Sequence, residues 1–339
     1  MSKYFVGYVT LRSLTTVTDT QARKLTHLNL AFAPMKDGRT VMELTDRQLL
    51  ELRRIRRANP RLAILVSTGG GGDRGHGEAT STPEGLDKLT ASTLEIVEKY
   101  GLDGIDCDWE FPGDTGILEE KYQHTALFAD YRHKLDLLSG KTGKKYWLTT
   151  AAGAGEWYLR RTEIHRSHEY LDFINLMTYD SNTDSTVAGH HTHLFESKSP
   201  GCPRIQSAHH NISIMVAAGV PIDKILIGVA FFSHRWDMVP DIRHGLYQNT
   251  PFKNDYGPSY TEIMLKYEPA MDYTKYWDED AKAPYLFNGS TFISYDDPQS
   301  VRHKCAYALA QGMAGAFYWV HDCDLGSVLF DSMYDSLFL

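Results

Sequence analysis

The stretch YGLDGIDCDWEFPG, residues 100–113, carries four acidic side chains in a segment that otherwise looks built for burial. Side chains on a β-strand alternate between two faces, so Asp106, Asp108 and Glu110 share one face and the apolar residues between them share the other. Three aligned carboxylates on a buried strand are costly unless they have a use. The stretch therefore predicts a strand whose apolar face packs against helices and whose acidic face points into a functional interior.

Seven further short apolar or β-branched runs occur along the chain, and segments of helical period separate them. The eight strand candidates cover residues 4–9, 27–33, 62–68, 102–110, 146–152, 172–179, 224–232 and 315–320. Helix starts are legible at Thr45, at Thr82 before Pro83, and at Asp297 before Pro298. Eight strands that alternate with helices predict an α/β fold, the (β/α)8 TIM barrel, for which about 250 residues is typical.

The chain has 339 residues, more than such a barrel needs. The surplus lies between the seventh strand and the helix that follows it, in a segment rich in Tyr, Trp, Asp and Pro. This segment is too long for an ordinary loop and too aromatic for a disordered linker. We expect residues 236–292 to form a small inserted α+β lobe on the catalytic face, and residues 1–235 and 293–339 to form the barrel.

Glu110 lies at the C-terminal end of its strand, and the catalytic residues of barrel enzymes lie at this end of the strands. Mutual repulsion and loss of hydration raise the pKa of at least one carboxyl in such a row. A carboxyl that keeps its proton near neutral pH is suited to general acid catalysis. The alternative is that these carboxylates are solvated turn residues or form ion pairs with cations on helices.

The composition narrows the choice of partners and location. A net charge of −8 and a pI near 6.0 make nucleic acid a poor partner. The sequence contains no run of eighteen apolar residues, so we expect no membrane span. The first residues lack the apolar core and the small-residue cleavage site of a signal peptide. Four cysteines without a CxxC pair favour a reduced, cytoplasmic setting, unless a secretion signal has been trimmed. We expect a monomer.

The segment DGIDCDWE, residues 103–110, matches the DxxDxDxE signature of glycoside hydrolase family 18, the family of chitinases. Further segments resemble the elements of that family at the expected strands: STGG at 67–70, MTYD at 177–180 and GAFYWVHDCD at 315–324. The similarity extends over nearly the whole chain, including the predicted lobe and the SYDDPQS segment at 294–300.

The resemblance implies catalytic roles for four residues. Glu110 would protonate the glycosidic oxygen and later act as base. Asp108 would orient the acetamido group of the substrate, with Asp106 beneath it sharing the proton, and Tyr179 would hydrogen-bond the acetamido carbonyl. Asp103 is expected to be structural. Trp319 would form the floor under the sugar, and the hydroxyls of Tyr8 and Ser67 would also hold Asp106 in place. The implied substrate-binding residues are Trp319, Met177, Asp180, Tyr8, Phe32, Ser67, Gly69, Gly70, Trp109 and Arg235.

The implied function is a retaining hydrolase of chitin or β-1,4-linked N-acetylglucosamine oligomers, with no cofactor and no metal. Members of this family use the acetamido oxygen of the substrate as nucleophile in place of a second carboxylate. Alternatives are an endo-β-N-acetylglucosaminidase that acts on glycoproteins, a glucosaminidase directed at peptidoglycan, and a chitin-binding lectin without activity. The retained Glu110, which such lectins typically replace, favours the enzyme.

One departure from the family pattern lies at the end of the seventh strand, where FFSHRW, residues 231–236, stands in place of a Tyr-Gly-Arg pattern. Either His234 or Arg235 could take the role of the sugar-contacting arginine. Outside the family pattern, four tryptophans could stack on sugar rings or belong to the core: Trp147, Trp157, Trp236 and Trp277.

Two further motifs have weaker functional interpretations. GGGDRG, residues 70–75, fits GxGxxG, but it follows the third strand and does not open directly into a helix, so we interpret it as a substrate loop. GHHTHLF, residues 189–195, could bring His190, His191 and His193 to a metal ion, but no firm fourth ligand accompanies them. We interpret this segment as a polar loop at the rim of the cleft.

Overall fold

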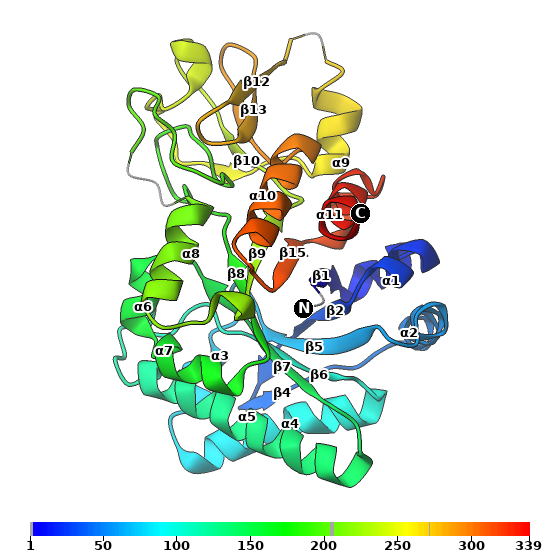
Figure 1. Cartoon of the computed structure of the whole chain (residues 1–339). Coiled ribbons are helices and arrows are strands. Elements are labelled where there is room, and N and C mark those ends of the chain that lie inside the picture. Colours follow the sequence, from blue (N-terminus) through cyan, green and yellow to red (C-terminus); the bar gives the residue numbers. More distant parts are fainter. Residues whose placement is uncertain (1–2, 204–206, 271) are drawn as a thin grey trace.

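A closed barrel of eight parallel strands forms the centre of the computed structural model, which describes residues 3–203, 207–270 and 272–339 (Figure 1). Around the barrel the strands follow the order β1-β15-β9-β8-β7-β6-β5-β2. The predicted (β/α)8 barrel is therefore confirmed, and each of its strands overlaps one of the eight predicted runs. The strands are β1 (Tyr4–Thr10), β2 (His27–Ala33), β5 (Ala63–Gly69), β6 (Gly104–Asp108), β7 (Trp147–Gly153), β8 (Phe173–Met177), β9 (Ile225–Ala230) and β15 (Gly315–Trp319).

Helices connect the strands and cover the barrel, as Figure 1 shows. The α-helices are α1 (Asp19–Lys24), α2 (Asp46–Ala58), α3 (Gly75–Ala79), α4 (Pro83–Tyr100), α5 (Glu120–Thr142), α6 (Glu156–Arg161), α7 (Ile164–Ser167), α8 (Ala208–Ala217), α9 (Tyr260–Glu262), α10 (Pro298–Ala310) and α11 (Val328–Phe338). Short 3-10 turns are η1 (Leu11–Thr16), η2 (His168–Tyr170), η3 (Ile222–Lys224), η4 (Arg243–Gly245) and η6 (His321–Cys323), and η5 (Ile263–Tyr267) is a π-helical turn. Within the described residues, none of the helices combines the length and the apolar character needed to cross a membrane.

The three predicted helix starts are confirmed by their capping hydrogen bonds. The side chains of Thr45, Thr82 and Asp297 accept hydrogen bonds from backbone N–H groups in the first turns of α2, α4 and α10. Each bond satisfies a donor that the helix itself leaves unpaired.

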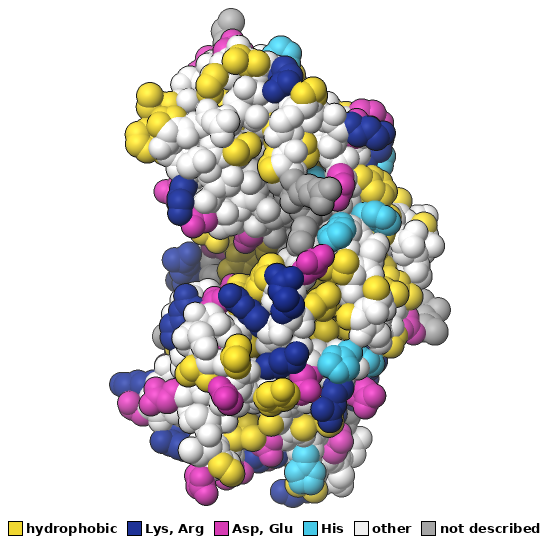
Figure 2. Space-filling model, turned by 90° about the vertical axis from the view of Figure 1, so that its left-hand side faces the viewer, with side chains coloured by type: hydrophobic (Ala, Val, Ile, Leu, Met, Phe, Trp, Pro, Cys, Tyr) yellow, Lys and Arg dark blue, Asp and Glu magenta, His cyan; other side chains and the backbone are white. Residues whose placement is uncertain are grey.

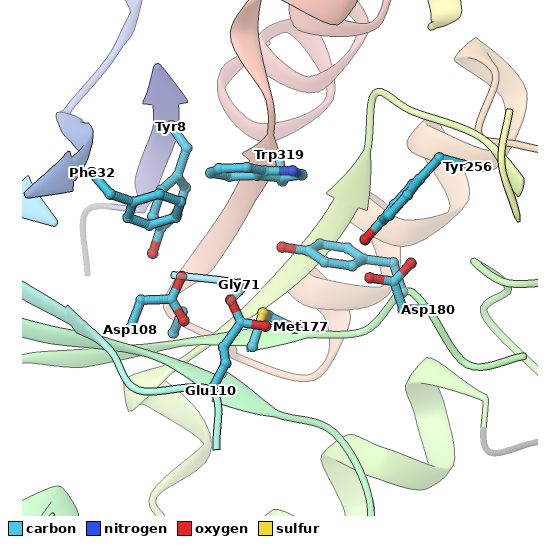
Figure 3. Close-up of a pocket in the computed structure, with 11 residues that line it drawn as sticks. Tyr8, Phe32, Gly71, Asp108, Glu110, Met177, Asp180, Tyr256 and Trp319 are labelled. Atoms are coloured by element: carbon cyan, nitrogen blue, oxygen red, sulfur yellow. The ribbon is translucent and has the colours of Figure 1, made fainter. Parts of the chain in front are cut away.

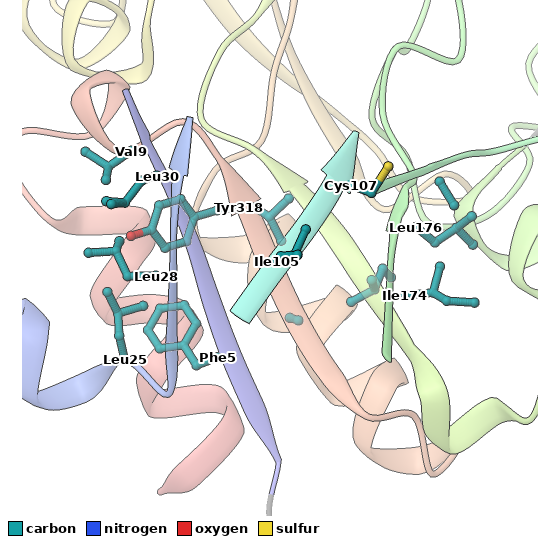
Figure 4. Packing of buried hydrophobic residues seen from close by; sticks show 14 of the residues in the cluster. Phe5, Val9, Leu25, Leu28, Leu30, Ile105, Cys107, Ile174, Leu176 and Tyr318 are labelled. Carbon is teal, nitrogen blue, oxygen red and sulfur yellow. The ribbon is translucent and has the colours of Figure 1, made fainter. Parts of the chain in front are cut away.

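The apolar face of β6 packs outward, as the alternation predicts. Ile105 and Cys107 are fully buried in the core between the barrel and its helices, and Figure 4 shows them with other members of this cluster. At the start of the strand, Asp103 accepts a hydrogen bond from the backbone N–H of Ile64 and pairs with Arg56. These contacts give Asp103 a structural role and hold β6 in register.

Aromatic side chains fill the barrel interior near the N-terminal ends of the strands. Tyr4, His27, Trp147 and Phe173 form one cluster with ring centroids 4.5 to 6.1 Å apart. This packing closes one end of the barrel, so a ligand reaches its interior from the C-terminal ends of the strands.

A second sheet stands beyond the C-terminal ends of the barrel strands, with strand order β11-β10-β14-β13-β12. Its antiparallel strands are β10 (His234–Trp236), β11 (Asp255–Tyr256), β12 (Thr274–Asp278), β13 (Ala283–Phe287) and β14 (Phe292–Ser294), and a separate hairpin is formed by β3 (Met35–Lys36) and β4 (Arg39–Thr40). The sheet uses residues 234–235 and 293–294, which the sequence assigned to the barrel. Figure 2 shows the molecule hollowed between this upper lobe and the barrel.

A buried ion pair ties the lobe to the barrel. The ammonium of Lys304, on α10, donates to Asp296 at 2.6 Å and to Thr192 at 2.5 Å, and the side chains of Lys304 and Asp296 are fully buried. Asp296 also accepts a hydrogen bond from the backbone N–H of Ala230 at the end of β9. The pair therefore joins α10, the end of β14, the β8–α8 connection and a barrel strand.

Lys304→Met is expected to lower the apparent free energy of unfolding by about 3–5 kcal/mol, because it leaves Asp296 buried without its partner charge. A matched control is Lys24→Met, whose ammonium pairs with the half-exposed Asp331, and the expected loss there is below about 1 kcal/mol. Urea denaturation of the two variants measures the difference. Equal losses would contradict the role given to the buried pair.

Candidate active site

A cavity opens at the C-terminal ends of the barrel strands, between the barrel and the lobe. The space between its walls amounts to about 480 Å³ and is partly open to solvent. Figure 3 shows the carboxyl groups of Asp108 and Glu110 on one side and the rings of Phe32 and Trp319 on the other. The lining residues are Tyr8, Phe32, Gly71, Asp108, Glu110, Ala151, Met177, Tyr179, Asp180, Tyr256 and Trp319.

A second, larger cavity of about 1210 Å³ adjoins the first, and both share the side chains of Glu110, Tyr179 and Asp180. Phe111 and Trp157 line only the second cavity. A ligand that extends from one cavity into the other therefore passes Glu110.

Asp106 lies deepest in the acidic row, where it is fully buried. One of its oxygens accepts hydrogen bonds from Tyr8 at 2.9 Å and Ser67 at 2.8 Å, and the other accepts from Thr149 at 2.6 Å and Asn175 at 3.3 Å. Burial raises the pKa of Asp106, and these four neutral donors act in the opposite direction. The donors come from four strands, so closure of the barrel fixes the position of this carboxyl.

Asp108 and Glu110 form a coupled pair above Asp106. Burial raises the pKa of Asp108 well above its usual value, and the charges of Glu110 and Asp106 add to the effect. Burial also raises the pKa of Glu110 to about 7, and the Asp180 carboxylate adds to it, whereas Arg74 lowers it. The two carboxyl groups interact, and this interaction helps to raise the pKa of Asp108. The pair therefore retains a proton near neutral pH.

The second oxygen of Asp108, Oδ1, is buried and lacks a hydrogen-bond partner within the part of the chain that the structure describes. Leaving a buried acceptor unpaired costs about 1–3 kcal/mol. Since Asp108 lines the first cavity, a ligand N–H group could supply the missing donor.

Aromatic residues from three strand ends complete the walls. Phe32 and Trp319 lie stacked with ring centroids 5.3 Å apart, and Tyr8 contacts the Trp319 ring edge-on. Burial, with the Asp180 and Asp108 charges, raises the pKa of Tyr179 well above its usual value. Its hydroxyl therefore stays protonated and can act as a hydrogen-bond donor.

The far wall is held from the lobe. His234 of β10 donates from Nε2 to Asp180 at 2.6 Å, and its Nδ1 accepts from the amide of Asn254 at 2.5 Å. Burial would raise the pKa of Asp180, but the neighbouring imidazoles of His191 and His234 outweigh it and lower the pKa to about 2. Asp180 is therefore a stable anion beside Glu110.

The alternation of side chains along β10 places His234 and Arg235 on opposite faces. His234 is buried and contacts Asp180 in the site. Arg235 lies on the opposite face, where its guanidinium pairs with Asp237, and it does not line either cavity. Its assignment as a substrate-binding residue stays a prediction, which the lining of the two cavities does not support.

Four other predicted substrate-binding residues lie outside both cavity linings. Ser67 is buried beneath Asp106, and Trp109 is in the core, stacked on His76. Gly69 and Gly70 have φ of +89°, and a Cβ on either would meet the backbone of Asp108 or the Phe32 ring within 2.6 Å. These glycines shape the site through close packing of the backbone. The next glycine, Gly71, lines the cavity.

Apart from the fully buried Asp106, the remaining predicted residues meet in the first cavity: Tyr8, Phe32, Asp108, Glu110, Met177, Tyr179, Asp180 and Trp319. Sequence reasoning missed Tyr256, whose ring from β11 lines both cavities. No pattern in the lobe sequence distinguishes this tyrosine from its aromatic neighbours. Among the four tryptophans, Trp157 lines the second cavity and Trp236 is fully buried in the lobe core.

The three histidines of the 189–195 segment do not converge on one point. His190 contacts Asp278 at 3.2 Å, whereas His191 lies 3.7 Å from Asp180. His190, His191 and His193 therefore do not form a metal site with one another.

The pKa of Glu110 can be tested through Arg74, whose positive charge lowers it. In wild type we expect the carboxyl of Glu110 to titrate near pH 7. Arg74→Gln should move the midpoint to higher pH, because the deprotonated carboxylate of Glu110 loses the stabilising charge of the cation. The carboxyl resonance in ¹³C-labelled protein measures the midpoint. Arg160→Gln, which removes a more distant exposed cation paired with Glu156, should leave it unchanged. A midpoint near that of a free glutamate would contradict the account.

Known proteins resemble this chain in sequence and structure. A structure described as a glycoside hydrolase family 18 N-acetylglucosaminidase from Paenibacillus barengoltzii is 41% identical, with a TM-score of 0.95, and the match covers 99% of this chain and 100% of that chain. Chitinase A1 of Niallia circulans is 32% identical over 290 residues, and chitotriosidase-1 of Mus musculus is 29% identical over 318 residues. These matches cover 79% and 90% of this chain, but 42% and 68% of the two relatives.

The family assignment rests on a match that spans most of the molecule. The family described as glycosyl hydrolases family 18 matches residues 4–324, which include every barrel strand and the lobe. The resemblance carried by the DxxDxDxE signature is confirmed, and the chain belongs to family 18 of the glycosyl hydrolases.

Proposed function

We propose that this chain is a retaining glycosidase that cleaves β-1,4-linked N-acetylglucosamine oligomers or chitin with the help of the substrate's own acetamido group. The observation that carries the proposal is the buried Oδ1 of Asp108, which faces the cavity without a donor beside Glu110, whose pKa burial raises to about 7. An acetamido N–H in the first cavity would supply that donor.

In the first step, the proton that the carboxyl pair retains passes to Glu110 and from Glu110 to the glycosidic oxygen, so the bond from the anomeric carbon to this oxygen breaks. The acetamido carbonyl oxygen forms a bond to the anomeric carbon and gives a cyclic oxazolinium ion. Asp108 accepts the amide N–H and stabilises the positive charge, while the Tyr179 hydroxyl donates to the carbonyl oxygen and aligns it.

In the second step, the deprotonated Glu110 takes a proton from water, and the resulting hydroxide attacks the anomeric carbon and reopens the ring. Two displacements at one carbon retain the β configuration. The sugar on the departing side would lie in the second cavity, against Phe111 and Trp157, because the two cavities meet at Glu110.

Two product patterns are compatible with this chemistry. Chitinase relatives favour the cleavage of oligomers, whereas the similarity to the P. barengoltzii enzyme, described as an N-acetylglucosaminidase, favours release of single sugars. An N-glycan core and peptidoglycan fragments are the other substrates to compare. The lectin alternative is disfavoured by Glu110 and its raised pKa.

Glu110→Gln is expected to lower kcat by at least 10²- to 10⁴-fold, roughly the contribution of general acid–base catalysis. Binding of N-acetylglucosamine oligomers should change little, because glutamine keeps the shape of the side chain. Turnover of a chromogenic oligomer and calorimetric binding to the variant measure the two effects. Glu98→Gln, on the outer helix α4, serves as control and should leave kcat unchanged. Full turnover by Glu110→Gln would refute the assignment.

The initial product from N-acetylglucosamine oligomers is expected to be the β-anomer. NMR spectra recorded in the first minutes, before mutarotation, identify the anomer of the product. Mass spectrometry of the same samples gives the length of the product. The α-anomer as first product would rule out the substrate-assisted route. If the enzyme cleaved an N-glycan core but not the oligomers, the proposed chitin-type substrate would be wrong. The proposed mechanism would not be affected by that result.

A further inference from the structure

Three potential metal ligands meet at the wall that the two cavities share. Asp180 follows β8, His191 lies in the β8–α8 connection and His234 lies on β10 of the lobe sheet. Their ligand atoms all lie within 4.8 Å of one another. Figure 3 shows the Asp180 carboxylate exposed toward the cavity. Because Asp180 follows a barrel strand and His234 belongs to the lobe sheet, the barrel and the lobe must both fold before the cluster exists.

His191 lacks the hydrogen bonds that a buried imidazole normally makes. The residue is fully buried, yet neither ring nitrogen has a hydrogen-bond partner among the described residues. Its Nδ1 lies 3.7 Å from the nearest Asp180 oxygen, too far for a hydrogen bond. The two unpartnered ring nitrogens are therefore available to a further ligand, and an imidazole nitrogen is a common ligand of metal ions.

We propose that Asp180, His191 and His234 form a binding site for a first-row transition-metal ion such as Zn²⁺, and that the bound ion inhibits hydrolysis. Two imidazoles and one carboxylate suit Zn²⁺, Cu²⁺, Ni²⁺ and Fe²⁺, whereas Mg²⁺ and Ca²⁺ prefer oxygen ligands alone. The site has three protein ligands, which leaves a coordination position for water on the cavity side.

Binding requires small movements of the side chains. Ligands at about 2.0–2.2 Å from a tetrahedral ion lie roughly 3.3 Å apart. The Asp180–His234 pair, now 2.6 Å apart, must open, and His191 must approach the other two ligands. For Nε2 of His234 to become a ligand, the proton that it donates to Asp180 must leave, with Nδ1 as the protonated nitrogen of the bound ring.

Asn254 can accommodate that change of tautomer. Its amide now donates to Nδ1 of His234, and rotation of the amide by a half turn would present its oxygen as acceptor for the relocated proton. Ligand histidines usually have such a partner on the second nitrogen, which orients the ring. Asn254 would therefore support His234 in both the metal-free and the metal-bound state.

The bound ion would compete with substrate. Asp180 lines both cavities, so an ion on its carboxylate, with its remaining water, occupies space on the path past Glu110. Inhibition should therefore be competitive and reversible by a chelator.

The test is a titration of metal-free full-length protein with Zn²⁺, followed by calorimetry, together with the visible spectrum of the Co²⁺ complex. We expect one tight site per chain and the intense visible bands of tetrahedral Co²⁺. His191→Gln and His234→Gln should each weaken binding at this site at least 10-fold. His193→Gln, a buried histidine of the same segment outside the cluster, is the matched control and should bind as wild type. Circular dichroism checks that each variant is folded.

Several outcomes would overturn the proposal. Wild type that takes up no Zn²⁺ below about millimolar concentration would exclude the site. Equal Zn²⁺ affinity in wild type and in both folded variants would place the ion elsewhere. Binding at the cluster without any change in the KM for an N-acetylglucosamine oligomer would exclude the inhibitory role. The first two readouts do not depend on hydrolysis, so they stand even where the proposed activity fails.

Discussion

The burial of one carboxyl, Asp106, in the middle of the barrel is the constraint on which the rest of the site depends. Its four hydrogen-bond donors lie on β1, β5, β7 and β8, so they meet only when the sheet has closed. Because both oxygens of Asp106 are satisfied by neutral groups, the residue stays in place without a counter-ion. Its negative charge then acts on the next carboxyl of the row, Asp108, and helps to keep a proton on the Asp108–Glu110 pair.

The lobe contributes to the same site from the opposite side. The ion pair of Lys304 and Asp296 anchors the lobe to the barrel, and His234 holds Asp180 from the lobe sheet. Asp180 in turn raises the pKa of Glu110. The barrel therefore supplies the carboxyl pair and the Asp180 charge, and the lobe supplies His234, which holds Asp180, and the aromatic Tyr256, which lines the cavity.

The parts that could be predicted from sequence are those that depend on local periodicity. Alternation along a strand places Asp106, Asp108 and Glu110 on one face and buries Cys107 on the other, and capping residues mark the starts of α2, α4 and α10. The family signature adds most of the cavity lining. Alternation could also have distinguished His234 from Arg235, but only once the start and the pairing of β10 were known.

Contacts between distant segments could not be predicted in this way. Tyr256 and Asn254 reach the site through the register of the lobe sheet and its loops. His191 meets Asp180 because the β8–α8 connection turns back on itself, with a backbone hydrogen bond from Ser181 to His191. The sequence predicts Gly69 and Gly70 as substrate-binding residues, but in the structure these two glycines permit close backbone packing. The neighbouring Gly71 lines the cavity. Each of these outcomes depends on the three-dimensional path of the chain rather than on a local pattern.

The central claim is that the substrate's acetamido oxygen is the nucleophile. The most direct measurement compares kcat/KM for β-glycosides of glucosamine that carry N-acetyl, N-fluoroacetyl, N-difluoroacetyl and N-trifluoroacetyl groups on the same leaving group. Fluorine withdraws electrons from the carbonyl oxygen and weakens it as a nucleophile. The account predicts a steep, monotonic fall in kcat/KM across the series, and a flat series would contradict it.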